Sequence, residues 1–149
     1  MPQLKSILCP TDFSEFSDRA IRYACELAET FGAEVHLLNV LQDYDTVAPG
    51  LGESFAPFTE WLPELRKQSE EQLRKQPGPE WASKVAVHRS TSVGPPVDEI
   101  MKYAKEHNID LIVQGTHGRR GIKHMLLGSV AENIVRYAPC PVLTVRERS

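Results

Sequence analysis

The stretch from Gly115 to Gly128 has the composition of a phosphate-binding loop. It combines four glycines with three positive side chains and contains no carboxylate: Gly115, Gly118, Gly121, Gly128, Arg119, Arg120 and Lys123. Glycines let backbone N–H groups approach an anion closely, and clustered cations raise the local potential for one. The same glycines are also compatible with simple turns, so their spacing alone leaves both interpretations open.

The residues on either side place this loop between a strand and a helix. Residues 110–114 read as a short buried strand, and Ser129 begins an amphipathic helix that has Val130 and Ile134 on its apolar side. A helix N-terminus directs N–H groups and a partial positive charge at a bound phosphate. Ser129 has a structural alternative, because with Glu132 three residues later it fits a capping box.

Apolar runs alternate with helical patterns along the remainder of the chain. Strands are expected at residues 4–9, 34–40, 84–88, 110–114 and 142–145. Helices are expected from Ser14 or Ser17 to Gly32, over residues 62–75, after Pro95 and from Ser129. Residues 42–61 lack a clear period and are predicted to form a long loop. The pattern predicts one doubly wound α/β domain, with a five-stranded parallel sheet covered by helices on both faces.

Ligands of doubly wound sheets bind at the carboxyl ends of the strands, near the point where the strand order reverses. Pro10, Thr11 and Asp12 follow the first strand, and Val40 ends the second. A carboxylate at the position of Asp12 can accept hydrogen bonds from two ribose hydroxyls. Alternatively, Asp12 or Thr11 simply turns or caps the chain.

Several catalytic signatures are missing from the sequence. It contains no Gly-x-x-x-x-Gly-Lys-Ser/Thr loop, no Gly-x-Gly-x-x-Gly fingerprint after the first strand and no Gly-x-Ser-x-Gly elbow. No pair of carboxylates stands out as an acid and a base. A phosphate-binding loop without catalytic residues favours binding over turnover.

The composition narrows the class of protein and its surroundings. The 149 residues suit one domain, and the net charge of −3 argues against nucleic-acid binding. No apolar run approaches the roughly 20 residues of a membrane span, and the N-terminus lacks a secretory pattern, so a cytoplasmic protein is expected.

Neither the cysteines nor the histidines are spaced like the ligands of a metal site. The three cysteines lie far apart and are expected to be buried hydrophobic residues. His36, His88 and His107 are scattered along the chain, so no metal site is predicted.

Taken together, these residues resemble the universal stress protein A family over the whole chain, residues 1–149. The nucleotide-binding members of that family carry Gly-x2-Gly-x9-Gly-Ser/Thr, and Gly115, Gly118, Gly128 and Ser129 have this spacing. The opening at residues 7–12 and the ending at residues 138–145 are also similar to those of the family. The resemblance implies a Rossmann-like fold of the adenine nucleotide alpha hydrolase type.

The resemblance also implies a role for individual residues. Asp12, with Pro10 and Thr11, would lie near the ribose of ATP, and the backbone of Val40 would contact adenine. Gly115 would lie beneath the ribose, and Thr116 would belong to the nucleotide-binding residues. The phosphates would be held by Gly118, Arg119, Gly128, Ser129 and Val130, and Mg²⁺ could bridge them. Family members are commonly homodimers joined through the last strand, here Val142–Val145.

Three functional hypotheses follow from the sequence. The first is an ATP-binding regulatory or stress-response module whose nucleotide state controls binding to a protein partner that the sequence does not identify. The second is a slow ATPase or phosphotransferase, for which Asp12 and His117 are the only candidate catalytic residues. The third is a chaperone-like interaction protein that does not depend on nucleotide.

Overall fold

The computed structural model describes residues 3–42, 58–117 and 127–147. These residues contain a five-stranded sheet in which every pair of neighbouring strands is parallel, in the order β3-β2-β1-β4-β5. The strands are β1 (Ser6–Pro10), β2 (Glu34–Leu41), β3 (Val87–Val93), β4 (Leu111–Gly115) and β5 (Val142–Val145). The helices are α1 (Glu15–Phe31), α3 (Phe58–Arg74), α4 (Pro96–Glu106) and α5 (Ser129–Tyr137), with a 3₁₀ turn at Pro79–Trp81. The predicted doubly wound fold is confirmed.

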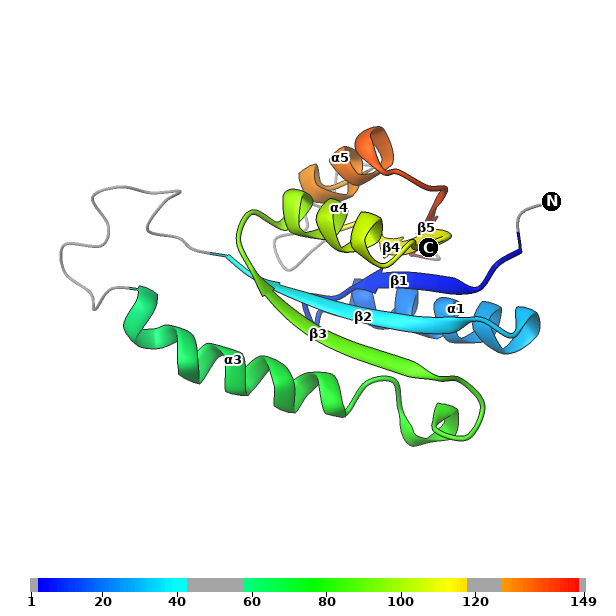
Figure 1. Ribbon diagram of the computed structural model, residues 1–149, viewed down its shortest axis with the longest axis horizontal. Coiled ribbons are helices and arrows are strands. Elements are labelled where there is room, and N and C mark those ends of the chain that lie inside the picture. Colours follow the sequence, from blue (N-terminus) through cyan, green and yellow to red (C-terminus); the bar gives the residue numbers. More distant parts are fainter. Residues whose placement is uncertain (1–2, 43–57, 118–126, 148–149) are drawn as a thin grey trace.

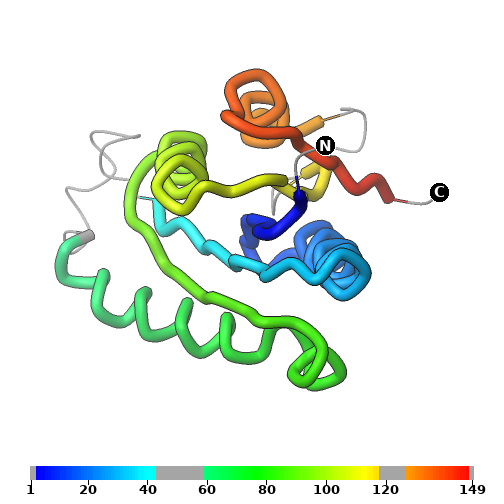
Figure 2. Tube along the Cα trace, turned by 45° about the vertical axis from the view of Figure 1, so that its right-hand side comes forward, coloured from blue at the N-terminus to red at the C-terminus, as the bar shows by residue number. Residues whose placement is uncertain are grey.

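Helices cover both faces of the sheet (Figures 1 and 2). On one face, Ile7 and Cys9 of β1 pack into a core with α1 and with Leu73 of α3. On the other face, Leu8 packs into a second core with α4 and α5. Because side chains alternate along a strand, the consecutive apolar residues Ile7, Leu8 and Cys9 are buried in turn on both faces, which explains the hydrophobic run in β1.

The order of the strands puts the switch point between β1 and β4. From β1 the chain proceeds through β2 to β3 at one edge, and then returns past β1 to β4 and β5 at the other edge (Figure 1). The carboxyl ends of β1, β2 and β4 are therefore adjacent. The predicted convergence of the loops that follow these three strands is confirmed by this order.

The prediction was wrong for the limits of the third strand. β3 spans Val87–Val93 rather than residues 84–88, and it continues through Arg89 and three polar residues. β3 lies at an edge of the sheet and is only partly buried, so it lacks the apolar run that marks the inner strands. Val85, which suggested an earlier start, is buried in a turn where its N–H donates to the Trp81 carbonyl.

Local signals predicted the limits of α1 correctly and those of α3 only in part. Ser14 caps the start of α1, and Gly32 ends it in the left-handed conformation. α3 begins at Phe58, so the predicted loop at residues 42–61 ends earlier than expected, and residues 43–57 lie outside the described part.

The structure bears on the predictions about membrane spans and about the burial of the cysteines. Among the described residues, no helix is long and apolar enough to cross a membrane. Cys9 and Cys25 are buried and Cys140 is partly buried, all three as free thiols. The prediction of buried cysteines is therefore confirmed for Cys9 and Cys25, whereas Cys140 only packs against the edge of the second core.

Candidate functional site

A hydrogen bond joins the two ends of the glycine loop. The N–H of Gly128 donates to the carbonyl oxygen of Thr116 at 2.7 Å. Thr116 directly follows β4, and Gly128 is the N-cap residue of α5. The bond therefore holds the start of α5 beside the carboxyl end of β4. Gly118 and Arg119, like Arg120 and Lys123, lie outside the described residues.

The N-terminus of α5 carries no side-chain cap among the described residues. Gly128 occupies the N-cap position, and the exposed Ser129 and Val130 form the start of the first turn. The predicted Ser129–Glu132 capping box is wrong, because Ser129 lies one residue inside the helix and Glu132 pairs with Arg136 at 3.4 Å. The first-turn N–H groups have no partner within the helix and carry the positive end of its dipole.

Asp12 lies in the turn between β1 and α1 and helps to build that turn. Its Oδ1 accepts hydrogen bonds from the Ser14 N–H at 2.9 Å and the Ser17 hydroxyl at 3.2 Å. Thr11 Oγ1 accepts from the N–H of Phe13, which adopts a left-handed φ of 65°. Asp12 and Thr11 thus stabilise the turn after β1, which is the structural alternative that the sequence left open. A carboxylate offers about four acceptor positions, so this role is compatible with binding ribose.

Buried polar groups hold this turn against the second strand. The Thr11 N–H donates to the Leu38 carbonyl at 2.9 Å, and the Asn39 amide donates to the Thr11 carbonyl at 2.8 Å. Ser69 of α3 in turn donates to Asn39 Oδ1 at 2.9 Å. Asn39 and Ser69 were not predicted to belong to the site, because nothing in a single sequence shows that these two positions meet.

Val40 presents its backbone on the side where β1 ends. Leu38 accepts its hydrogen bond from the β1 side, whereas Leu41 accepts from Gly94 on the opposite, β3 side. Backbone groups alternate along a strand, so the N–H and C=O of Val40 face the β1 side. β1 ends at Pro10, which pairs with Leu38, so Val40 extends beyond its neighbour. Its backbone polar groups therefore border the switch point.

Helix α1 contacts the end of β4 through Phe16. The ring of Phe16 packs against His117, with centroids 5.6 Å apart, and His117 Nδ1 lies 3.1 Å from Thr116 Oγ1. A Cβ placed on Gly115 would lie 2.8 Å from the Phe16 carbonyl oxygen. Gly115 is therefore required by close packing of α1, independently of any ligand.

A hollow beside the loop includes residues that the sequence analysis missed. It has a volume of about 220 Å³ and is lined by Thr116, Leu127, Thr144 and Arg146. Thr144 and Arg146 come from β5 and the residue that follows it. Pairing of β4 with β5, which places Thr144 opposite Gln114, brings them there. Arg146 adds a positive charge near the glycine loop.

A second polar cluster lies at the opposite, amino ends of the strands. Glu34 and His36 of β2 and His88 of β3 bring their ligand atoms within 4.8 Å of one another. The histidines that are scattered in the sequence are thus not scattered in the folded chain. Their sequence spacing gave no signal, because the pairing of β2 with β3 sets His36 opposite His88.

Comparison with known proteins identifies the family. The model of the universal stress protein family matches residues 3–146. Universal stress protein MJ0531 of Methanocaldococcus jannaschii is 38% identical over 146 residues, covering 96% of this chain and 82% of the relative. The solved structure of MJ0577 from the same organism is 29% identical with a TM-score of 0.82, covering 99% of each chain.

Two less similar structures share the fold and were solved with nucleotides. A universal stress protein in complex with cAMP has a TM-score of 0.65, and one from Archaeoglobus fulgidus in complex with dAMP has a TM-score of 0.59. Each is 23% identical; both cover 97% of this chain and 98% of their own length. The family model matches nearly the whole chain and the solved relative MJ0577 shares its fold, so the chain belongs to the universal stress protein family.

Proposed function

We propose that this protein binds ATP at the carboxyl ends of β1 and β4 and acts as a nucleotide-dependent regulatory or stress-response module. The observation that carries the proposal is the hydrogen bond from Gly128 to Thr116. It holds the N-terminus of α5, which has no side-chain cap from the described residues, at the switch point, where a phosphate would meet several backbone N–H groups. The two structures of this fold that hold cAMP and dAMP support an adenine nucleotide as the ligand.

The proposed pose takes the residue roles that the family resemblance implies, and it is supported by the position of these residues at the ends of the strands. Adenine would contact the backbone of Val40, and the ribose hydroxyls would bond to Asp12. The phosphates would lie at the backbone N–H groups of Ser129 and Val130 and the Ser129 hydroxyl. Arg119 would contribute charge from the loop, and Mg²⁺ would bridge phosphate oxygens with water as its main remaining ligand.

Gly128 offers the sharpest test of this pose. In the described structure, a Cβ at Gly128 would meet His117 and Thr116 at 3.5 Å, an ordinary contact distance. The described residues therefore leave room for a Cβ at this position, whereas a phosphate lying against the backbone would not. If substitution of Gly128 abolishes ATP binding, the loss would therefore reflect a clash with the bound phosphate and not a disrupted fold.

Calorimetry with ATP on purified protein tests the proposal, after mass spectrometry for co-purified nucleotide. We expect one ATP per chain, and we expect Gly128→Val to weaken binding at least about 10-fold, equivalent to about 1.4 kcal/mol. Phosphate release measured on the same samples tests the hypothesis of slow hydrolysis. Absence of ATP binding by folded, nucleotide-free protein would refute the proposal. It would favour the hypothesis of a nucleotide-independent interaction protein.

We also propose that two copies of the chain pair through β5. This strand lies at the edge of the sheet, and an unpaired edge readily recruits another chain. The neighbouring helix α5 leaves Val130, Val135 and Tyr137 40%, 51% and 62% exposed. The expected apolar role of Val130 inside the chain is thus not observed, and a partner subunit would cover part of this surface.

A further inference from the structure

The amino ends of β2 and β3 carry a cluster of metal-ligand types that is separate from the proposed nucleotide site. Glu34 and His36 lie on one face of β2, two residues apart, and His88 lies opposite His36 on β3. The cluster is at the far end of β2 from Leu41, roughly 20 Å away at about 3.3 Å per residue. Neither the phosphate-binding loop nor the β1–α1 turn contributes to it.

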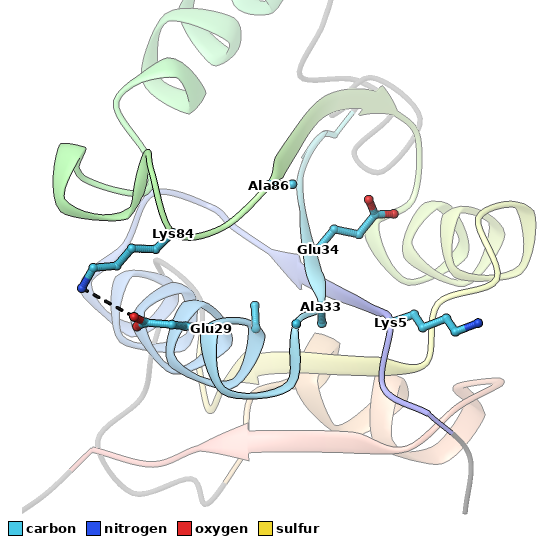
Figure 3. A pocket seen from close by; sticks show the side chains of 8 residues that line it. Lys5, Glu29, Ala33, Glu34, Lys84 and Ala86 are labelled. Atoms are coloured by element: carbon cyan, nitrogen blue, oxygen red, sulfur yellow. Dashed lines mark ion pairs between the residues drawn. The ribbon is translucent and has the colours of Figure 1, made fainter.

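Figure 3 shows the surroundings of Glu34 at this end of the sheet. A hollow of about 470 Å³ is lined there by residues that include Glu29, Glu34 and Lys84. Lys84 pairs with Glu29 at 3.7 Å, and the Glu34 carboxylate turns away from this ion pair (Figure 3). Glu34 instead contacts the two histidines on the side of the sheet that α4 covers.

The two shorter distances within the cluster are close to the edge length of a zinc coordination tetrahedron. Glu34 Oε1 lies 3.3 Å from His36 Nε2, and Glu34 Oε2 lies 3.0 Å from His88 Nε2. Tetrahedral zinc, with bonds of about 2.0–2.2 Å, separates its ligand atoms by about 3.3–3.6 Å. All three ligand atoms already lie within 4.8 Å of one another, and His88, at 52% side-chain exposure, has room to adjust.

Helix α4 orients the buried member of the cluster. His36, with 7% of its side chain exposed, has its Nδ1 2.7 Å from the Tyr103 hydroxyl. His107 stacks on Tyr103 with ring centroids 3.8 Å apart and thereby supports it. A histidine that binds metal through one ring nitrogen normally has its other nitrogen held by a hydrogen bond, and Tyr103 occupies that outer position.

The chemical environment favours the forms that bind metal. Hydrogen bonds from His88 and His36 lower the pKa of the Glu34 carboxyl, so it is ionised at neutral pH. Burial lowers the pKa of His36, which keeps its imidazole neutral. Imidazole nitrogens together with a carboxylate suit Zn²⁺, whereas Mg²⁺ and Ca²⁺ prefer oxygen ligands alone.

We propose that Glu34, His36 and His88 form a binding site for a divalent metal ion such as Zn²⁺. Tyr103 is the residue that positions His36. Three protein ligands leave one position for water, which is accessible because Glu34 and His88 are half-exposed. The alternative is a hydrogen-bonded Glu–His cluster that only joins β2, β3 and α4.

Zinc titration of the full, nucleotide-free chain distinguishes these possibilities. After dialysis against a chelator, Zn²⁺ is titrated in competition with a chromogenic chelator. We expect one ion per chain with a Kd below about 10 µM. Glu34→Gln and His88→Ala should each weaken binding at least about 10-fold, and Tyr103→Phe by about 10-fold. Co²⁺ should give visible absorption bands in the wild type that Glu34→Gln and His88→Ala lose.

Glu29→Gln is the matched control, because it removes a carboxylate from the same hollow but not from the cluster. Its zinc affinity should equal that of the wild type, and circular dichroism should show every variant to be folded. Absence of stoichiometric binding would overturn the proposal in favour of a purely structural cluster. Unchanged binding in both Glu34→Gln and His88→Ala would also overturn it, by assigning the ion to other residues.

Discussion

The Cβ that any side chain would place at residue 115 falls 2.8 Å from the carbonyl oxygen of Phe16. Helix α1 and the end of β4 can approach this closely only because residue 115 is glycine. Gly115 and Gly128, the first and third glycines of the family pattern, are thus glycine for different reasons. Gly115 is required by the packing of the protein itself, whereas the space around Gly128 in the described structure permits a side chain.

Gly115→Ala should therefore lower the free energy of unfolding by about 1–3 kcal/mol, because a backbone carbonyl cannot turn aside as a flexible side chain can. Urea denaturation followed by circular dichroism measures this change. Gly128→Ala is the control and should lose no more than about 1 kcal/mol, mainly because alanine is a poor N-cap residue. Equal losses in the two variants would contradict the assignment.

Asp12→Asn should separate the structural role of Asp12 from its proposed role in ribose binding. The amide oxygen can still accept from the Ser14 N–H, so we expect the turn and the stability to persist. ATP affinity should fall about 10-fold, because an amide oxygen is a weaker and single acceptor for two hydroxyls. Calorimetry with 2′,3′-dideoxy-ATP is the control. This nucleotide lacks both ribose hydroxyls, so the substitution should not change its affinity. An equal loss for both nucleotides would argue against ribose recognition.

Thr144→Pro should shift the proposed dimer towards monomer. Ile112 donates to the Pro141 carbonyl and pairs with Val142, so residues 141 and 143 bond towards β4. The N–H of Thr144 consequently faces the open edge, where proline removes the donor that a partner strand needs. Sedimentation equilibrium measures the change.

Thr144→Val is the matched control for that experiment. It removes the hydroxyl that accepts from Gln114 at 3.2 Å but retains the edge N–H, so it should remain dimeric. If the wild-type protein sediments as a monomer, or if the proline variant remains a dimer, pairing through β5 is excluded.

Cys25 should resist thiol reagents in the native protein. Burial, followed by the nearby carboxylates of Glu80 and Glu26, raises the pKa of its thiol to about 11. The thiolate is the reactive form, so native labelling of Cys25 should become appreciable only as the pH approaches that value. Peptide mapping at pH 8 should show Cys140 labelled first, and all three cysteines labelled in denaturant. Equal native rates for Cys25 and Cys140 would be inconsistent with this burial.

The same shift predicts how Cys25 affects stability at high pH. Its folded pKa lies above the value of about 8.5 expected for an unfolded chain, so the fold favours the protonated thiol. That contribution is fully present below pH 8.5 and is lost as the pH rises towards 11. Cys25→Ser should flatten this part of the stability curve, which denaturation at several pH values would reveal.

Local patterns predicted the fold because its inner strands are buried on both faces. The runs around Leu8 and Ile112 have no polar interruption, and the caps at Ser14 and Gly32 are local to α1. The same patterns failed at β3, where an edge position admits polar residues. They also failed at Ser129, where the capping box is a local option that α5 does not use because its N-cap is Gly128.

The sequence by itself determined the alternation of strands and helices, the glycine loop with its cations and the family that these features resemble. All of these depend on neighbours within a few residues, where chain geometry alone restricts what can form. Only the tertiary structure decided that Phe16 requires glycine at residue 115 and that Glu34, His36 and His88 meet at one end of the sheet. Those contacts depend on strand order and register, which arise from burial of the whole core and not from any local pattern.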